Sequence, residues 1–137
     1  MPDTPHLVAR LPSVEEYLYL REIAGLSPFS PEAARIGLPG SVFAVVIEDR
    51  GRAIGMGRIV GDGGCFFQIT DIAVDPAWQG RGFGKRIVAA LMDHVREALP
   101  DTAYVSLIAD RPADRLYAQY GFADVGPRSI GMAHRRT

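Results

Sequence analysis

The stretch that decides the fold of this chain reads Ile72-Ala73-Val74-Asp75-Pro76-Ala77-Trp78-Gln79-Gly80-Arg81-Gly82-Phe83-Gly84-Lys85. It begins with the apolar end of a strand expected over residues 66–74, passes through a turn and continues as a glycine-rich loop. After the loop, Ile87, Leu91 and Val95 recur every four residues. This spacing predicts an amphipathic helix from about Gly82 to Leu99. A strand, a glycine-rich loop and a long helix therefore follow one another directly.

A loop in this setting is suited to binding an anion. The first N–H groups of a helix lack intrahelical partners, and the helix dipole favours negative charge beside them. Glycines let the backbone approach a bulky anion, while Arg81 and Lys85 can add charge-assisted contacts. The residues thus predict a phosphate or pyrophosphate site. The spacing fits neither the dinucleotide loop G-x-G-x-x-G nor the P-loop, in which Lys85 would precede Ser or Thr. A turn that only helps helix and strand to pack is the alternative interpretation.

The flanking sequence predicts a sheet covered by helices. Ser13-Val14-Glu15-Glu16 is a capping box, which predicts a helix up to about Ala24 with Gly25 as its end, and Pro31 begins a second, short helix. Strands are expected over residues 42–47, 53–60 and 66–74. Beyond the long helix we expect a strand over 103–109, a helix over 112–120, and strands over 122–125 and 129–134. The order predicts an α/β (α+β) fold in one domain over residues 1–137.

Composition argues against several functional classes. The 15 Lys and Arg residues nearly balance 16 Asp and Glu residues, so no basic surface for nucleic acid is expected. Apolar runs are far shorter than the roughly 20 residues of a membrane span, and no leader peptide is recognisable. Cys65 is the only cysteine, which excludes an internal disulfide and fits a reducing compartment. The histidines do not cluster at metal-ligand spacing. A cytoplasmic protein without a metal is expected.

Two motifs together resemble the GNAT superfamily of acyl-CoA-dependent N-acyltransferases. Gln79-x-x-Gly82-x-Gly84 resembles the pyrophosphate loop Q/R-x-x-G-x-G/A of that family. A second match lies downstream and resembles the family's segment N-x-x-A-x-x-L-Y-x-x-x-G-F. It reads Asp110-Arg111-Pro112-Ala113-Asp114-Arg115-Leu116-Tyr117-Ala118-Gln119-Tyr120-Gly121-Phe122. The two motifs have the order and separation expected for the family. The resemblance covers about residues 66–122. It implies a GNAT-like mixed, mostly antiparallel sheet, flanked by helices and splayed where the acyl-CoA lies.

The resemblance also implies which residues hold acetyl-CoA as the cosubstrate. The pyrophosphate would be held by Gln79, Gly80, Arg81, Gly82, Phe83 and Gly84, with Lys85 beside them. The backbone of Ile72, Ala73 and Val74 would pair with the pantetheine arm like an added strand, and an amide near Val74 would polarise the thioester carbonyl. Asp110 stands where the family has Asn. It can accept hydrogen bonds but lacks the amide donor, so its cofactor contact stays an open candidate.

Catalytic roles are implied in the same way. Tyr117 aligns with the tyrosine that protonates the departing thiolate, the alternative being an ordinary packing residue. Gln68 stands where a Glu or His base sometimes occurs; it cannot take a proton but can orient a water. Asp71 is the nearest carboxylate, yet strand alternation places it on the opposite face unless a bulge intervenes. A water chain, or Glu22 or Glu32, is the remaining alternative for the base.

The expected reaction is transfer of an acetyl group from acetyl-CoA to the primary amine of a small molecule, by direct attack with both substrates bound. Phe29 is the candidate acceptor contact, because it lies in a loop between the two N-terminal helices. Two alternatives stay open: acetylation of a protein Lys or N-terminus, and a non-catalytic acyl-CoA sensor. A homodimer formed through the C-terminal strands is expected only by analogy with the family.

Overall fold

The computed structural model describes residues 5–136, which divide after Leu107 into two compact units. The first unit contains, in chain order, β1 (His6–Val8), α1 (Val14–Ile23), α2 (Pro31–Gly37), η1 (Leu38–Gly40), β2 (Phe43–Asp49), β3 (Arg52–Gly61), β4 (Phe66–Val74), η2 (Pro76–Trp78), α3 (Phe83–Ala98) and β5 (Tyr104–Ser106). The second unit contains α4 (Asp114–Ala118). Among the described residues, no helix is long and apolar enough to cross a bilayer.

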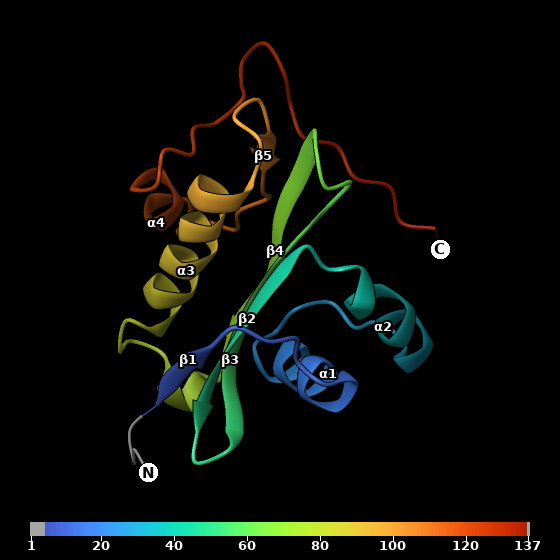
Figure 1. The fold of residues 1–137 in the computed structure, drawn as a ribbon, viewed down its shortest axis with the longest axis vertical. Coiled ribbons are helices and arrows are strands. Elements are labelled where there is room, and N and C mark those ends of the chain that lie inside the picture. Colours follow the sequence, from blue (N-terminus) through green and yellow to red (C-terminus); the bar gives the residue numbers. More distant parts are fainter. Residues whose placement is uncertain (1–4, 137) are drawn as a thin grey trace. The chain divides into compact units, whose positions relative to one another are not determined.

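The strands of the first unit form one sheet in the order β1-β2-β3-β4-β5. The first four strands pair antiparallel, and β5 runs parallel to β4. This confirms the predicted mixed, mostly antiparallel sheet. In Figure 1, α3 lies on one side of the sheet, and α1 and α2 lie on the other.

β4 and β5 separate soon after they meet. Their pairing is limited to Phe66, Phe67 and Gln68 of β4, which lie opposite residues 104–106. No described strand pairs with the remainder of β4, residues 69–74, on that side. The edge is therefore open over the last two thirds of the strand, as the predicted splay requires.

The helix α3 packs directly against the backbone of β3. Gly55 and Gly57 face it, and a Cβ on Gly57 would lie only 2.5 Å from Cγ2 of Ile87 and 3.2 Å from Cδ1 of Leu91. Ile87 and Leu91 are fully buried. The absence of side chains on these glycines thus lets α3 lie close to the sheet, which fixes where its N-terminus meets the end of β4.

The opposite side of the sheet is covered by α1. Tyr17 and Leu20 of this helix form a core cluster with Met56 and Ala73 of the sheet. The predicted capping box is confirmed: the Ser13 hydroxyl accepts from the Glu16 N–H at 3.1 Å, and the Glu16 carboxylate accepts from the Ser13 N–H at 2.8 Å. The helix ends at Ile23 and Gly25 follows with φ of 81°.

The expected secondary structure omitted one strand and included two that are absent from the described residues. β1 was not predicted, and strands expected over residues 122–125 and 129–134 are absent from the described residues. Instead, the Asp124 carboxylate accepts from the Gly126 N–H at 2.8 Å, and the Val125 carbonyl accepts from the Ser129 N–H at 3.2 Å. These turns use the polar backbone groups that a strand would pair with a neighbour. The last strand and the last helix are also shorter than expected.

Candidate active site

A β-bulge interrupts β4 at the centre of the open edge. The register with β3 passes from Met56 opposite Ala73 to Arg58 opposite Thr70, so residues 71 and 72 share one partner, Gly57. Asp71 adopts the left-handed conformation, with φ of 60°. A bulge of this kind inserts one residue and changes which face the following side chains occupy.

The bulge corrects the face assignment expected from simple alternation. Alternation grouped Gln68, Thr70 and Ile72 on one face and Asp71 on the other. In the structure, Asp71 lies on the α1 side, where it contacts Tyr17 and Arg58. Thr70 lies on the same side, because it is paired directly with Arg58. Ile72 turns to the α3 side, where its Cγ1 would be 3.4 Å from a Cβ on Gly57.

The open edge of β4 and the glycine-rich loop border a cavity that is open to solvent. Its volume is about 260 Å³. The lining residues are Ile72, Val74, Trp78, Gln79, Gly80, Gly82, Phe83 and Gly84. Seven of these were expected to hold acetyl-CoA, and Trp78 is the addition. The chain thus brings the strand end and the loop to one hollow, as their adjacency in sequence predicts.

Within the stretch from residue 72 to 85, three residues expected at the cofactor site do not line this cavity. Ala73 points into the core on the α1 side and is 4% exposed, so only its backbone is available to the edge. Lys85 is exposed on the first turn of α3. Arg81 is also exposed, and its guanidinium lies 4.8 Å from the centroid of the Trp78 ring. Both cations stand beside the loop, where they add positive charge.

The loop geometry leaves helix N–H groups free for a ligand. Gly80 and Gly82 have φ of 80° and 84°, a region that favours glycine. Gly82 is the N-cap of α3 and supplies no side-chain cap, and no acidic residue lies in the first turn. The side chain of Gln79 donates to the Val74 carbonyl at 3.0 Å, which ties the loop to the end of β4. An arrangement of this kind at a helix N-terminus is suited to binding an anion.

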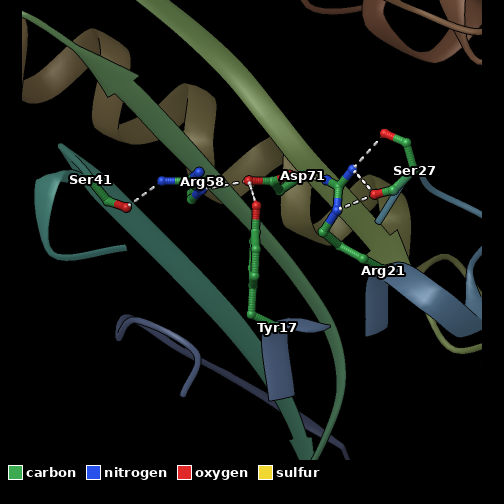
Figure 2. A network of polar contacts seen from close by, with 6 residues as sticks. All are labelled: Tyr17, Arg21, Ser27, Ser41, Arg58 and Asp71. Carbon is green, nitrogen blue, oxygen red and sulfur yellow. Dashed lines mark hydrogen bonds and ion pairs between the residues drawn. The ribbon is translucent and has the colours of Figure 1, made fainter. Parts of the chain in front are cut away.

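A buried polar network lies on the α1 side of the bulge (Figure 2). The carboxylate of Asp71, 3% exposed, is ion-paired with Arg21 and with Arg58, whose Nε lies 2.5 Å away. It also accepts from the Tyr17 hydroxyl at 2.9 Å. Burial, then the charge of Asp71, raises the pKa of the Tyr17 phenol, so this donor stays protonated.

Two loops are attached to this network. Arg21 donates to the Ser27 carbonyl at 2.6 Å, and Arg58 donates to the Ser41 hydroxyl at 3.0 Å. The Phe29 ring, expected near an acceptor, covers Arg21 with its centroid 4.5 Å from the guanidinium carbon.

Sequence reasoning missed Tyr17, Arg21 and Arg58. Two signals were available: Tyr17 and Arg21 are four residues apart on one helix face, and Arg58 interrupts an apolar strand.

Gln68, Tyr117 and Asp110 are the remaining residues expected at the site. Gln68 is half-buried in β4 and lines a second cavity of about 220 Å³ near the pairing with β5. Tyr117 belongs to α4 in the second unit, where its ring meets Phe122 edge to face with centroids 6.3 Å apart. Burial, followed by the nearby charge of Asp110, raises the pKa of the Tyr117 phenol. The Asp110 carbonyl accepts from the Ala113 N–H at 2.8 Å, ahead of this helix.

No group of three or more His, Cys, Asp or Glu side chains that could hold a metal ion occurs within residues 5–136. The candidate site offers backbone amides at the start of α3 and exposed cations beside the loop. Such groups suit the binding of a phosphorylated ligand and the polarisation of a carbonyl.

Comparison with known proteins agrees with this geometry. A model of the GNAT acetyltransferase domain matches residues 39–124, more than half of the chain. The chain is 38% identical over 63 residues to the N-alpha-acetyltransferase RimI of Mycobacterium tuberculosis, a match covering 45% of the chain and 38% of that protein. It is 33% identical over 79 residues to the histone acetyltransferase TAP1 of Glycine max, covering 58% and 33%. These matches span about a third of the length of the curated relatives.

Solved structures extend the similarity over nearly the whole chain. A protein of unknown function from meticillin-resistant Staphylococcus aureus, described as a probable acetyltransferase, is 44% identical with a TM-score of 0.90. The match covers 96% of this chain and 99% of that one. The ribosomal-protein-S18-alanine N-acetyltransferase of Escherichia coli shares the fold, with a TM-score of 0.74 at 18% identity, over 90% and 80% of the two chains. By its matching domain and its shared fold, the chain belongs to the GNAT acetyltransferase family.

Proposed function

We propose that the protein is an N-acetyltransferase that transfers the acetyl group of acetyl-CoA to the primary amine of a small molecule. The observation that carries this proposal is the union of two features in one cavity. The first is the uncapped N-terminus of α3 behind a loop with left-handed glycines, and the second is the open edge of β4. One feature suits a pyrophosphate and the other suits an extended amide-bearing arm.

The residues present fit acetyl-CoA. A Cβ built on Gly80, Gly82 or Gly84 meets no atom within 4 Å, so space for a phosphate lies directly over the loop backbone. Arg81 and Lys85 supply positive charge beside it, and the outer edge of β4 offers backbone groups of residues 69–74. The loop would hold the pyrophosphate, and residues 72–74 would hold the pantetheine arm.

The chemistry assigned to the chain is positioning, polarisation and proton transfer. The amine nitrogen attacks the thioester carbon, the C–N bond forms and the C–S bond breaks. A backbone N–H near Val74 stabilises the negative charge that develops on the carbonyl oxygen. The phenol of Tyr117 gives its proton to the departing thiolate, and its raised pKa keeps that proton in place at neutral pH.

We assign removal of the amine proton to water rather than to Asp71. Both carboxylate oxygens of Asp71 are engaged, one by Arg21 and the other by Arg58 and Tyr17. Accepting a proton would break at least one of these buried contacts, which is costly. Gln68 stays a candidate for orienting the water.

The charge of the network favours one class of acceptor. Arg21 and Arg58 carry two positive charges against the single negative charge of Asp71. Like charges close together in a poorly hydrated site repel each other strongly. An amine with a neighbouring carboxylate or phosphate is therefore favoured over a polyamine or an aminoglycoside, with Phe29 as the candidate contact for its apolar part.

A second candidate is acetylation of a protein N-terminus. It is favoured by the similarity to a protein named as an N-alpha-acetyltransferase. An acceptor peptide belongs in the same assay, because both candidates use the same donor and differ only in the amine.

The test incubates the purified protein with acetyl-CoA and a panel of amines, and follows release of free thiol. Tyr117→Phe should lower turnover by about 10²-fold or more while CoA binding is kept. Tyr120→Phe, which removes a hydroxyl three residues away, is the matched control and should change little. Thiol release that depends on one amine class names the acceptor. CoA binding without turnover for any amine or peptide would favour an acyl-CoA sensor, and absence of CoA binding would refute the assignment of the 79–84 loop.

A further inference from the structure

The bulge in β4 depends on an unfavourable backbone conformation. Asp71 has φ of 60°, which residues with a Cβ seldom adopt, although aspartate tolerates it better than most. Arg50 is the other described non-glycine residue with positive φ, and it lies in the exposed turn between β2 and β3. Asp71, in contrast, is buried within a strand. Contacts with the surrounding structure must therefore hold Asp71 in this backbone conformation.

Three side chains supply that restraint. Tyr17 and Arg21 reach Asp71 from α1, and Arg58 reaches it from the neighbouring strand β3 (Figure 2). In the sequence, Asp71 is 13 residues from Arg58. It is 54 residues from Tyr17 and 50 residues from Arg21. The carboxylate is thus fixed from two directions by elements that the sheet and the helix packing already hold in place.

The bulge determines which side chains line the cavity proposed to bind acetyl-CoA. Beyond Asp71, the side chain of Ile72 faces the α3 side and lines the cavity together with Val74. In a regular strand, the faces of residues 72–74 would be exchanged, since one inserted residue reverses the alternation. The apolar wall of the cavity, and the direction of the backbone groups along the open edge, therefore depend on the conformation of Asp71.

Stability alone does not account for such a network. A buried carboxylate with two guanidinium groups gains little over well-packed apolar residues of similar volume, because all three charges lose their hydration. What an ion-paired carboxylate supplies here, and an apolar residue would not, is a directional hold on one backbone conformation.

We propose that Asp71 is a positioning residue for acetyl-CoA, held by Tyr17, Arg21 and Arg58 so that the bulge presents residues 72–74 to the pantetheine arm. The inference rests on the proposed function, because it concerns how that same cavity receives its cosubstrate. Under this inference, Asp71 contributes to the binding of acetyl-CoA and takes no part in proton transfer.

The experiment compares Asp71→Ala with Asp71→Gly, using calorimetric titration with CoA and steady-state kinetics. Both variants lose the carboxylate, but glycine adopts positive φ without strain. The Kd for CoA should rise about tenfold in Asp71→Ala, and by clearly less in Asp71→Gly, as a lost left-handed preference requires. At saturating acetyl-CoA, the shape of the pH profile of kcat should not change, because no proton passes through Asp71.

Asp62→Ala is the matched control. Asp62 accepts three backbone hydrogen bonds in the turn between β3 and β4, from Gly64, Cys65 and Phe66, and lies outside the network. Its Kd for CoA should equal that of the wild type. A folded Asp71→Ala variant with unchanged Kd overturns the inference, and so does loss of kcat at unchanged Kd, which would identify a base.

If Asp71→Ala does not fold, Tyr17→Phe provides the test. This variant keeps the aromatic ring and both ion pairs of Asp71, and it removes only the hydrogen bond from the Tyr17 hydroxyl. Faster amide hydrogen exchange at residues 71–74, with a weaker Kd, supports the inference, whereas no change in either overturns it. Wild-type protein that binds no CoA refutes the proposed function itself, so the two failures are distinguishable.

Discussion

Replacing Gly82 by alanine isolates the energetic role of one backbone angle in the loop. Gly82 has φ of 84° and caps α3, and a Cβ added there meets no atom within 4 Å. No steric clash within the protein accompanies the substitution. The penalty is therefore the left-handed conformation alone, about 1–2 kcal/mol for a residue with a Cβ.

This penalty must appear in one of two measurements. If Gly82→Ala keeps the native loop, the free energy of unfolding in urea falls by the full amount. If the free loop relaxes, the cost is transferred to ligand binding, and the Kd for CoA rises about 5- to 30-fold by calorimetry. The two losses together should add up to about 1–2 kcal/mol, plus any contact between the new methyl group and a phosphate.

Gly84→Ala is the matched control. Gly84 lies in the first turn of α3 without positive φ, and its added Cβ also meets open space. Alanine is a better helix former than glycine by about 1 kcal/mol, so this variant should be as stable as the wild type or more stable. Gly82→Ala with both unfolding free energy and Kd unchanged would refute the reasoning about the loop.

Three further outcomes are expected. Gly57→Ala should lower the free energy of unfolding by about 1–3 kcal/mol, because its Cβ would lie 2.5 Å from a buried methyl group, whereas Gly64→Ala meets open space and should change it little. The pKa of Tyr117 is raised above the ordinary phenol value of 10.0, so kcat should show no Tyr117-dependent fall below pH 10, and such a fall would contradict the role. Hydrogen bonding from Arg10 lowers the pKa of Glu16. The stabilisation of the fold by this pair is therefore present above the ordinary pKa of 4.5 and is lost as the pH falls through the lowered pKa. Arg10→Met should flatten the acid limb of the curve of unfolding free energy against pH.

Sequence was informative where the signal was local. The capping box at Ser13, the proline at the start of α2 and the four-residue period of α3 each specify an element through neighbours in the chain. The strand before the loop was predicted with its observed bounds, Phe66 to Val74. Because loop and strand adjoin in sequence, most residues of the cavity could be predicted as well.

Sequence was uninformative where partners are distant. The bulge at Asp71 is held by side chains 13, 50 and 54 positions away, and alternation within one strand carries no trace of them. β1 has three residues, too few for a period to be visible. The strands expected after residue 121 failed for the related reason that alternation describes a strand only when a neighbour pairs with it.

The open edge of β4 also bears on how the protein behaves when it is empty. Unpaired strand edges are templates for pairing with other chains, and soluble proteins normally cover or charge them. A ligand bound along this edge shields it and stabilises the native state, by about 2.7 kcal/mol at a concentration 100 times its Kd. Under the proposed function, the supply of acetyl-CoA would therefore govern the lifetime of the protein against aggregation as well as its rate of turnover.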